Sequence, residues 1–389
     1  MTINNKNNTQ LDVASEIISS SSVDNSATIL KNHPNKPAVF MILLVNLGSP
    51  ISLSKSAIAR FLFRFLKDKR VVPLPKFVWY PILLGIILPF RSKRLLKEYT
   101  KLWQVANLNT SPLLHYTQTQ AEHLQEYYNK QYLTSDIAKK LRLDLTSKYS
   151  ELTNNNFELP IIVKYAFSYS MPDIDTSLRE MHQEYQIDKL LVIPMYPQFS
   201  STTTSAVFDN IMKFYSNKYY LPNLFFEQSF YNNKHYIQAL VNSILQSWSN
   251  MQRKASVLIF SYHGIPENLI HKGDVYYSQC LITSSLVAKA LNLTNDEYIV
   301  AFQSKFGKNK WLTPSTTDVL INLVKSNIKS VDIICNGFVC ECLETLEEIA
   351  VLNKAVFYEH GGEYYNYIPC LNDNNDFNKI LIDIVDKYI

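Results

Sequence analysis

The fold is decided by the stretch VFMILLVNLGSP at residues 39–50. Its apolar run ends at Gly48-Ser49-Pro50, and a short apolar run closed by turn residues is typical of a buried parallel strand. Helical patterns, at 54–69 and 174–185 among others, alternate with further apolar runs at 160–167, 189–194, 256–260, 297–302 and 331–334. Strands that alternate with helices indicate parallel α/β units. We therefore predict an α/β fold of two similar doubly wound, Rossmann-like parallel-sheet domains with the active-site cleft between them.

The expected organisation has three parts. Residues 1–37 are rich in Asn, Ser and Thr and are predicted to be a disordered extension; they contain no Arg, which disfavours a transit peptide. The first domain is expected at 38–230 and the second at 231–373. A C-terminal helix, 374–389, is expected to pack back on the first domain.

Composition excludes some classes of partner and compartment. Hydrophobic residues make up 47% of the 389 residues, enough for a large core, and the net charge of +4 is interpreted as too small and too dispersed for nucleic acid. The five cysteines are an odd number and follow no secretory signal, so a reducing, cytoplasmic location is expected.

The longest apolar run is FVWYPILLGIILPF at 77–90. It is shorter than the roughly 20 residues of a spanning helix, and it carries Pro81 and Pro89. It is interpreted as a non-spanning element that forms core, the lip of a pocket or a surface that touches a membrane.

Glycines and a histidine mark the ends of the predicted strands. Gly48, Gly264 and Gly337 each fall just after a predicted strand, and Gly307 follows the strand at 297–302 by a few residues. Ligands of parallel α/β sheets bind at such strand ends. No Gly-rich phosphate loop is present, which disfavours a nucleotide site. His263, just before Gly264, is placed to accept a proton or bind a metal, although a lone His is more often structural.

Three acidic residues follow the strand at 331–334. Glu341, Glu344 and Glu348 are three and four apart, a spacing that places them on one face of an α-helix. They form either a solvated face near a helix start or an acidic ridge that takes cations or protons. The hydroxyl-rich loop 195–205 either binds a carboxylate or caps the next helix, and Trp311 is either a stacking platform or core.

These segments together resemble ferrochelatase, in its protoporphyrin-using bacterial form, from about residue 39 to the C-terminus. The motifs that carry the resemblance are VNLGSP (45–50), RFLKDKRVV (64–72), PILLGIILPFRSKR (81–94), SPLLHY (111–116), PMYPQFSSTTTSAVFD (194–209), FSYHGIP (260–266), GDVYYSQC (273–280), FQSKFGKNKWLTPST (302–316), CLETLEEI (342–349) and GGEYYNYIPCLND (361–373). Residues 1–37 lie outside it, and the stretch near 128–149 is extra length relative to the family.

The resemblance implies a chelatase-type fold and a role for each matching residue. His263 matches the active-site base and Glu344 the carboxylate that faces it, and both are expected to bind the iron. Glu341, where the family usually has Asp, and Glu348 match the ridge behind them. The expected substrate-binding residues are Leu47, Arg91, Ser111, Tyr169, Trp311 and Phe338. Asn336 replaces a Pro often found before Gly337.

The implied activity is insertion of Fe²⁺, a substrate, into protoporphyrin IX, with release of two protons to form protohaem. This lyase reaction is the last step of haem biosynthesis, and it needs a base near the pyrrole nitrogens, which suits His263. No nucleic acid partner is expected. Weak peripheral contact with the inner membrane is expected through the apolar lip 79–90.

Three alternatives stay open. A carrier of tetrapyrrole or iron on the same fold would lack the base and carboxylate that are present here. A second alternative is a chelatase that uses another metal or coproporphyrin. The metal is left open because imidazole and carboxylate also accept Co²⁺ and Zn²⁺. A [2Fe–2S] cluster needs four ligands, and Cys335, Cys340 and Cys342 supply three; cysteine is also a common core residue, and we do not expect a cluster.

Overall fold

The structure is a computed structural model that describes residues 36–134, 160–252, 254–305 and 309–389. Nearly all of the predicted extension, 1–37, and most of the extra stretch near 128–149 lie outside the described residues. Those two predictions therefore stay predictions.

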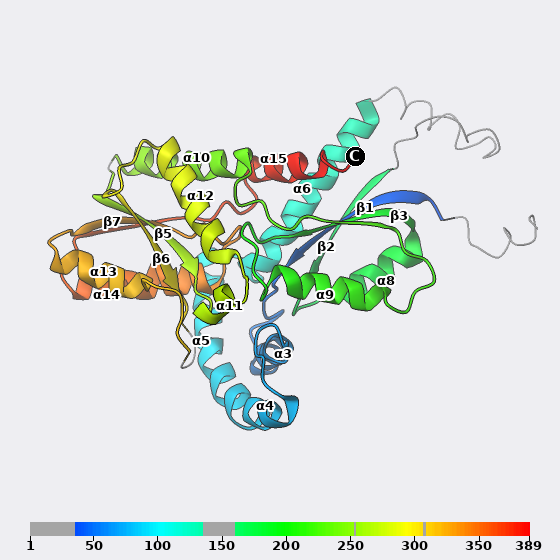
Figure 1. Ribbon diagram of the computed structural model, residues 1–389, viewed down its shortest axis with the longest axis horizontal. Helices are drawn as coiled ribbons and strands as arrows, with labels where there is room; N and C mark the ends of the chain where they lie inside the picture. The colour runs from blue at the N-terminus through cyan, green and yellow to red at the C-terminus, as the bar shows by residue number, and fades with distance from the viewer. Residues whose placement is uncertain (1–35, 135–159, 253, 306–308) are drawn as a thin grey trace, which may run out of the picture.

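Two four-stranded parallel sheets form the framework, as predicted (Figure 1). The first has the order β2-β1-β3-β4 and comprises β1 (Ala38–Asn46), β2 (Ile161–Phe167), β3 (Gln186–Pro194) and β4 (Asn223–Phe226). The second has the order β6-β5-β7-β8 and comprises β5 (Val257–His263), β6 (Tyr298–Gln303), β7 (Ser330–Ile334) and β8 (Tyr364–Ile368). The edge strands β4 and β8 were not predicted, because they are short and mostly half-exposed and lack a continuous apolar run.

Alternating residues of β1 face two different layers. Met41 and Leu43 pack towards α8 (Ile174–Glu184) and α9 (Thr204–Tyr215), whereas Ile42 and Leu44 face α6 (Pro112–Thr134). The latter layer continues into the second sheet through residues of α10 (Lys234–Met251), α12 (Tyr276–Ala290) and α15 (Asn375–Val385). On its other face the second sheet is covered by α13 (Thr316–Lys325) and α14 (Lys354–Glu359). One apolar layer therefore joins the two sheets.

The C-terminal helix α15 packs against both α10 and α6. Its N-cap is Asn374, whose side chain accepts a hydrogen bond from the backbone N–H of Phe377. The contact with α6 lies in the expected first domain and the contact with α10 in the second, so α15 bridges the two. The division at residue 230 is retained as a proposal.

A helical projection extends away from the sheets between β1 and α6 (Figure 1). It consists of α3 (Lys55–Leu66), which packs on α5, and a continuous helix made of α4 (Lys76–Ile82), the π-helical turn η1 (Leu83–Ile87) and α5 (Leu88–Ala106). We call residues 55–106 the projection and keep the term lip for residues 79–90. Among the described residues, no helix combines the length and apolarity needed to cross a bilayer.

Candidate active site

His263 is the last residue of β5, and its ring lies near two aromatic side chains. Ring centroids are 6.4 Å from Trp311 and 6.3 Å from Phe338. The imidazole Nδ1 is 2.6 Å from the carbonyl oxygen of Gly264. A carbonyl oxygen only accepts hydrogen bonds, so Nδ1 carries a hydrogen and, in the neutral ring, Nε2 keeps its lone pair. The strand end thus presents a base with a defined tautomer.

Gly264 permits a close approach that no other residue allows. A Cβ at this position would lie 2.9 Å from the carbonyl oxygen of Gln303 and 3.1 Å from the Trp311 ring. The strand-like pairing of Pro266 with Trp311 and the hydrogen bond from Leu312 N to Ile265 O, 3.0 Å, hold the Trp311 segment in place. Trp311 is therefore fixed beside His263.

The three acidic residues do not lie along an α-helix, and this part of the prediction is wrong. Glu344 begins η2 (Glu344–Asn353), which is a π-helix, and Glu341 lies in the loop before it. The π-helical geometry depends on i→i+5 hydrogen bonds that side-chain spacing does not reveal, and such segments occur frequently at functional sites.

The carboxylate of Glu341 is buried, and both of its oxygens accept hydrogen bonds from the protein. It accepts hydrogen bonds from the hydroxyls of Thr345 and Tyr367 and, at 3.0 Å, from the backbone N–H of Cys370. Burial raises the pKa of Glu341, and these hydrogen bonds oppose the shift. Glu341 therefore ties the loop after β7 to the end of β8.

Glu348, unlike Glu341, interacts electrostatically with His263, the predicted base. Burial raises the pKa of Glu348, while hydrogen bonds from Ser304 and the charge of His263 oppose the shift and the charge of Glu344 adds to it. A cavity of about 330 Å³ adjoins this carboxylate; its lining includes Gly264, Ser304 and Trp311. Glu348 is therefore an acid beside open space and in the electrostatic range of both His263 and Glu344.

Glu344 is half-buried where the projection meets η2. Its neighbours Leu343 and Leu346 pack with Leu47 in the apolar cluster of the projection. Burial lowers the pKa of Arg91, on α5, and the charge of Glu344 opposes the shift. Leu47, Arg91 and Glu344 are thus brought to one region, and their contacts with the substrate stay predictions.

Ser111 and Tyr169 lie in the interior. Ser111 is 1% exposed. The ring of Tyr169 packs on Phe65, and its hydroxyl donates a 2.8 Å hydrogen bond to Asp68. Tyr169 therefore anchors the loop between α3 and α4, and the predicted contacts of Ser111 and Tyr169 with substrate stay untested.

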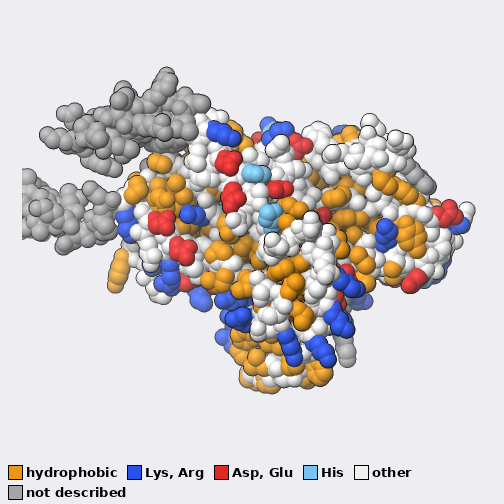
Figure 2. Space-filling view, turned by 180° about the vertical axis from the view of Figure 1, so that it is seen from behind, with side chains coloured by type: hydrophobic (Ala, Val, Ile, Leu, Met, Phe, Trp, Pro, Cys, Tyr) orange, Lys and Arg blue, Asp and Glu red, His pale blue; other side chains and the backbone are white. Residues whose placement is uncertain are grey.

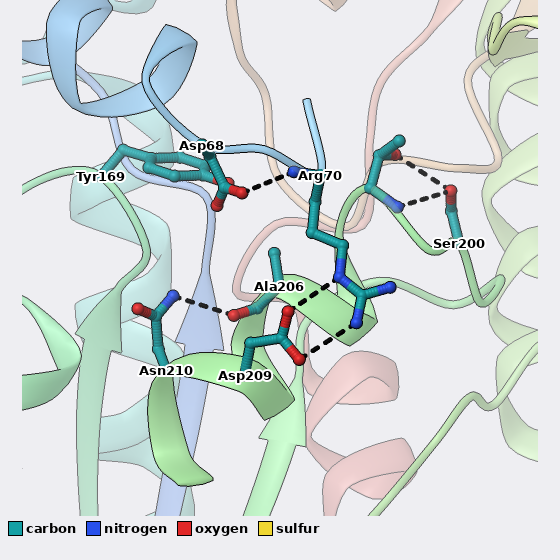
Figure 3. Close-up of polar contacts among 8 residues, drawn as sticks. Asp68, Arg70, Tyr169, Ser200, Ala206, Asp209 and Asn210 are labelled. Atoms are coloured by element: carbon teal, nitrogen blue, oxygen red, sulfur yellow. Dashed lines mark hydrogen bonds and ion pairs between the residues drawn. The ribbon is translucent and has the colours of Figure 1, made fainter. Parts of the chain in front are cut away.

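The same loop is held by a second contact (Figure 3). The guanidinium of Arg70 binds both carboxylate oxygens of Asp209 on α9, at 2.8 and 3.0 Å. The backbone N–H of Arg70 also donates to the Asp68 carboxylate. The projection is thereby tied to the first sheet at its base.

The hydroxyl-rich loop 195–205 binds a carboxylate, but one of the protein's own. Asp274 accepts hydrogen bonds from the backbone N–H of Ser201, 2.7 Å, and the hydroxyl of Ser200, 3.2 Å. Because the loop follows β3 and Asp274 lies just before α12, this contact joins the two halves of the molecule.

The polar residues Gln303, which is buried, and Ser304, which is half-buried, were missed by the sequence interpretation. They stand at the end of β6 and bond to Glu344 and Glu348, respectively. The available signal was their position: polar residues directly after an apolar strand, within the motif at 302–316.

The cysteines show no metal-binding arrangement in the part of the chain that is described. All five are buried, and no group of three or more His, Cys, Asp or Glu side chains there is placed to hold a metal ion. Burial raises the pKa of Cys340 to about 12, which opposes the thiolate form that ligates iron. The expected lack of a [2Fe–2S] cluster is still a prediction.

Comparison with known proteins identifies the family. The family described as "Ferrochelatase" matches residues 41–153 and 133–389. The chain belongs to the ferrochelatase family. It is therefore a metal chelatase of the lyase class that acts on iron and porphyrin in haem synthesis.

Individual relatives match along most of their length. A "Ferrochelatase" of Herminiimonas arsenicoxydans is 38% identical over 90% of this chain and 86% of its own, and a "Ferrochelatase 2" of Shewanella oneidensis is 39% identical over 90% and 97%. Among solved structures, SirB from Bacillus subtilis with Fe³⁺ superposes with a TM-score of 0.48 and 11% identity, over 90% of this chain and 95% of that one.

Proposed function

We propose that the protein inserts Fe²⁺ into protoporphyrin IX and releases two protons, which yields protohaem in the last step of haem synthesis. The observation that supports this most strongly is the tautomer of His263. With Nδ1 bonded to the Gly264 carbonyl, Nε2 is free to take a proton from a pyrrole nitrogen.

His263 and Glu344 are the proposed ligands of the incoming iron; because Nε2 of His263 has one lone pair, it binds the ion first and accepts a pyrrole proton only after the ion has moved to the porphyrin. An imidazole nitrogen and a carboxylate oxygen suit Fe²⁺ and help to replace the water that the ion loses. Glu348, beside the cavity, is proposed to carry protons away from His263. Glu341 remains in the proposed ridge, where its three hydrogen bonds favour support of the Glu344 loop over exchange with solvent.

The proposed porphyrin walls are apolar and aromatic. The rings of Trp311 and Phe338 lie near His263, and Leu47 is proposed to line the opposite face of the porphyrin. Arg91 is proposed to supply a cation for a propionate. Ser111 and Tyr169 are buried, and their contact with the porphyrin remains part of the proposal.

The tip of the projection is proposed to touch the inner-membrane surface weakly. Phe77 is 82% exposed and Phe90 75%, and the neighbouring Ile86 also faces outward. Trp79 and Leu83, expected to belong to the exposed lip, are instead buried and hold the helices together. An exposed apolar tip of this kind is typical of peripheral membrane contact.

Positive charge surrounds that tip. Residues 55–101 contain twelve Lys or Arg and only two acidic residues, so the charge is not dispersed as the composition suggested. Figure 2 shows hydrophobic side chains at the end of the projection with Lys and Arg beside them. This combination favours an anionic lipid surface.

The deciding experiment is an anaerobic assay with Fe²⁺ and either protoporphyrin or coproporphyrin, followed by haem absorbance. We expect faster turnover with protoporphyrin, because the long apolar lip disfavours a substrate with four carboxylates. Binding without turnover would support a carrier, and preference for coproporphyrin would overturn the proposed substrate.

A further inference from the structure

We propose that Gln303 is a positioning residue that holds Glu344 in register with His263. This inference rests on the proposed function, because both residues act there on the same metal. Gln303 ends β6, is 4% exposed and pairs with His263 in the register of β5 and β6.

The orientation of the Gln303 amide follows from its partners. Nε2 lies 2.7 Å from the backbone carbonyl oxygen of Glu344, which only accepts, so the amide donates there. Oε1 in turn accepts the hydroxyl of Ser261 at 2.7 Å and lies 3.6 Å from the thiol of Cys335. If the amide were reversed, Oε1 of Gln303 would face the carbonyl oxygen of Glu344, and neither atom could donate a hydrogen bond. The amide therefore has one orientation.

The backbone of Gln303 reaches the other side of the site. Its carbonyl oxygen accepts the N–H of Gly264 at 2.8 Å, directly after His263. One buried residue therefore bonds through its backbone to the segment of the base and through its side chain to the first residue of η2. His263 and Glu344 lie on separate segments, and Gln303 couples their positions.

Loss of the side-chain donor should affect chemistry more than porphyrin binding. The carbonyl of Glu344 would lose a buried partner, and η2 would be free to shift relative to β5. A displacement near 1 Å costs about a hundredfold in rate when reacting groups must be aligned. The proposed walls Trp311, Phe338 and Leu47 receive no hydrogen bond from the Gln303 side chain, so porphyrin affinity should persist.

The first test is Gln303→Met in the full chain, which keeps the length of the side chain and removes its hydrogen bonds. We expect kcat to fall at least tenfold, while the Kd for protoporphyrin, measured by fluorescence quenching, stays within about twofold. The matched control is Gln279→Met, another buried glutamine, which accepts a hydrogen bond from the backbone of Phe199. It should lower the melting temperature and leave kcat within about twofold.

Gln303→Glu tests the inference through the pH dependence of kcat, a quantity that a merely structural role of Gln303 would leave unchanged. The new side chain keeps an acceptor for Ser261 but, when ionised, has no donor for the Glu344 carbonyl. When protonated it regains an O–H donor. The ratio of its kcat to that of wild type should therefore rise as pH falls through the pKa of the introduced carboxyl.

Three results would overturn the inference: a kcat for Gln303→Met within twofold of wild type, an equal loss of kcat and porphyrin affinity, or a Gln303→Glu ratio independent of pH. If Gln303→Met does not fold, the pH series of Gln303→Glu decides. Failure of the proposed function is distinguishable, because wild type itself would then form no haem from protoporphyrin and Fe²⁺.

Discussion

Ser304 donates two hydrogen bonds to the carboxylate of Glu348, one from its backbone N–H at 2.7 Å and one from its hydroxyl. Ser304 holds a left-handed backbone, with φ of 65°, and this places both donors towards the same side chain. The loop after β6 therefore controls the ionisation of an acid on η2.

Ser304→Ala should move the acidic limb of the pH–rate profile to higher pH. The hydroxyl hydrogen bond opposes the effect of burial on the pKa of Glu348, so its removal lets that pKa rise further. Glu348 then becomes protonated at a higher pH and ceases to accept protons there. Ser304→Gly, which also lacks the hydroxyl but suits a positive φ, should shift the limb in the same direction. An unchanged limb in both variants would remove Glu348 from the proton route.

His263→Ala should abolish metallation and leave the fold intact. The side chain is only partly buried at the end of β5 and supplies no core contact comparable to an apolar residue. Haem formation is followed by absorbance, and circular dichroism and the melting temperature report on the fold. Turnover near the wild-type rate in a folded variant would show that another group is the base.

Glu344→Gln should keep porphyrin binding and lower turnover by about a hundredfold or more, the usual cost of losing a positioned acid or base. Glu348→Gln should do less harm, because water in the adjoining cavity can replace an outer member of the route. Fluorescence quenching measures binding, and haem absorbance measures turnover. Equal losses of both in Glu344→Gln would mean that the residue maintains the shape of the pocket.

Membrane contact should depend on both the apolar tip and the charge around it. The double variant Phe77→Ser and Phe90→Ser should reduce binding to vesicles that contain an anionic phospholipid, and raised salt should weaken wild-type binding. Lys93→Glu together with Lys97→Glu should reduce it as well, whereas Lys213→Glu on α9 serves as a control. Equal binding to neutral and anionic vesicles in a sedimentation assay would contradict the role of charge.

Local sequence patterns predicted much of the framework. The strands β1, β2, β3, β5, β6 and β7 and the helix that starts after Ser54 were found because apolar runs and turn residues act over a few neighbouring positions. His263 was singled out because it follows an apolar run at a strand end, and Glu344 because of its spacing from Glu341 and Glu348 and its place in a family motif; the roles of both stay predictions. The edge strands β4 and β8 lack such a run and were missed.

By itself, then, the sequence determined the two parallel sheets and the order of their main elements, and it named the candidates for base and metal ligand. The tertiary structure alone decided which groups meet: Gln303 with the carbonyl of Glu344, Ser304 with Glu348, Asp68 with Tyr169 and Asp274 with the loop at Ser201. It also decided that η2 is a π-helix and that Ser111 and Tyr169 are buried. The reason is physical: these partners are separated by 41 to 101 positions along the chain, and a buried donor finds its acceptor only when packing has brought distant segments together.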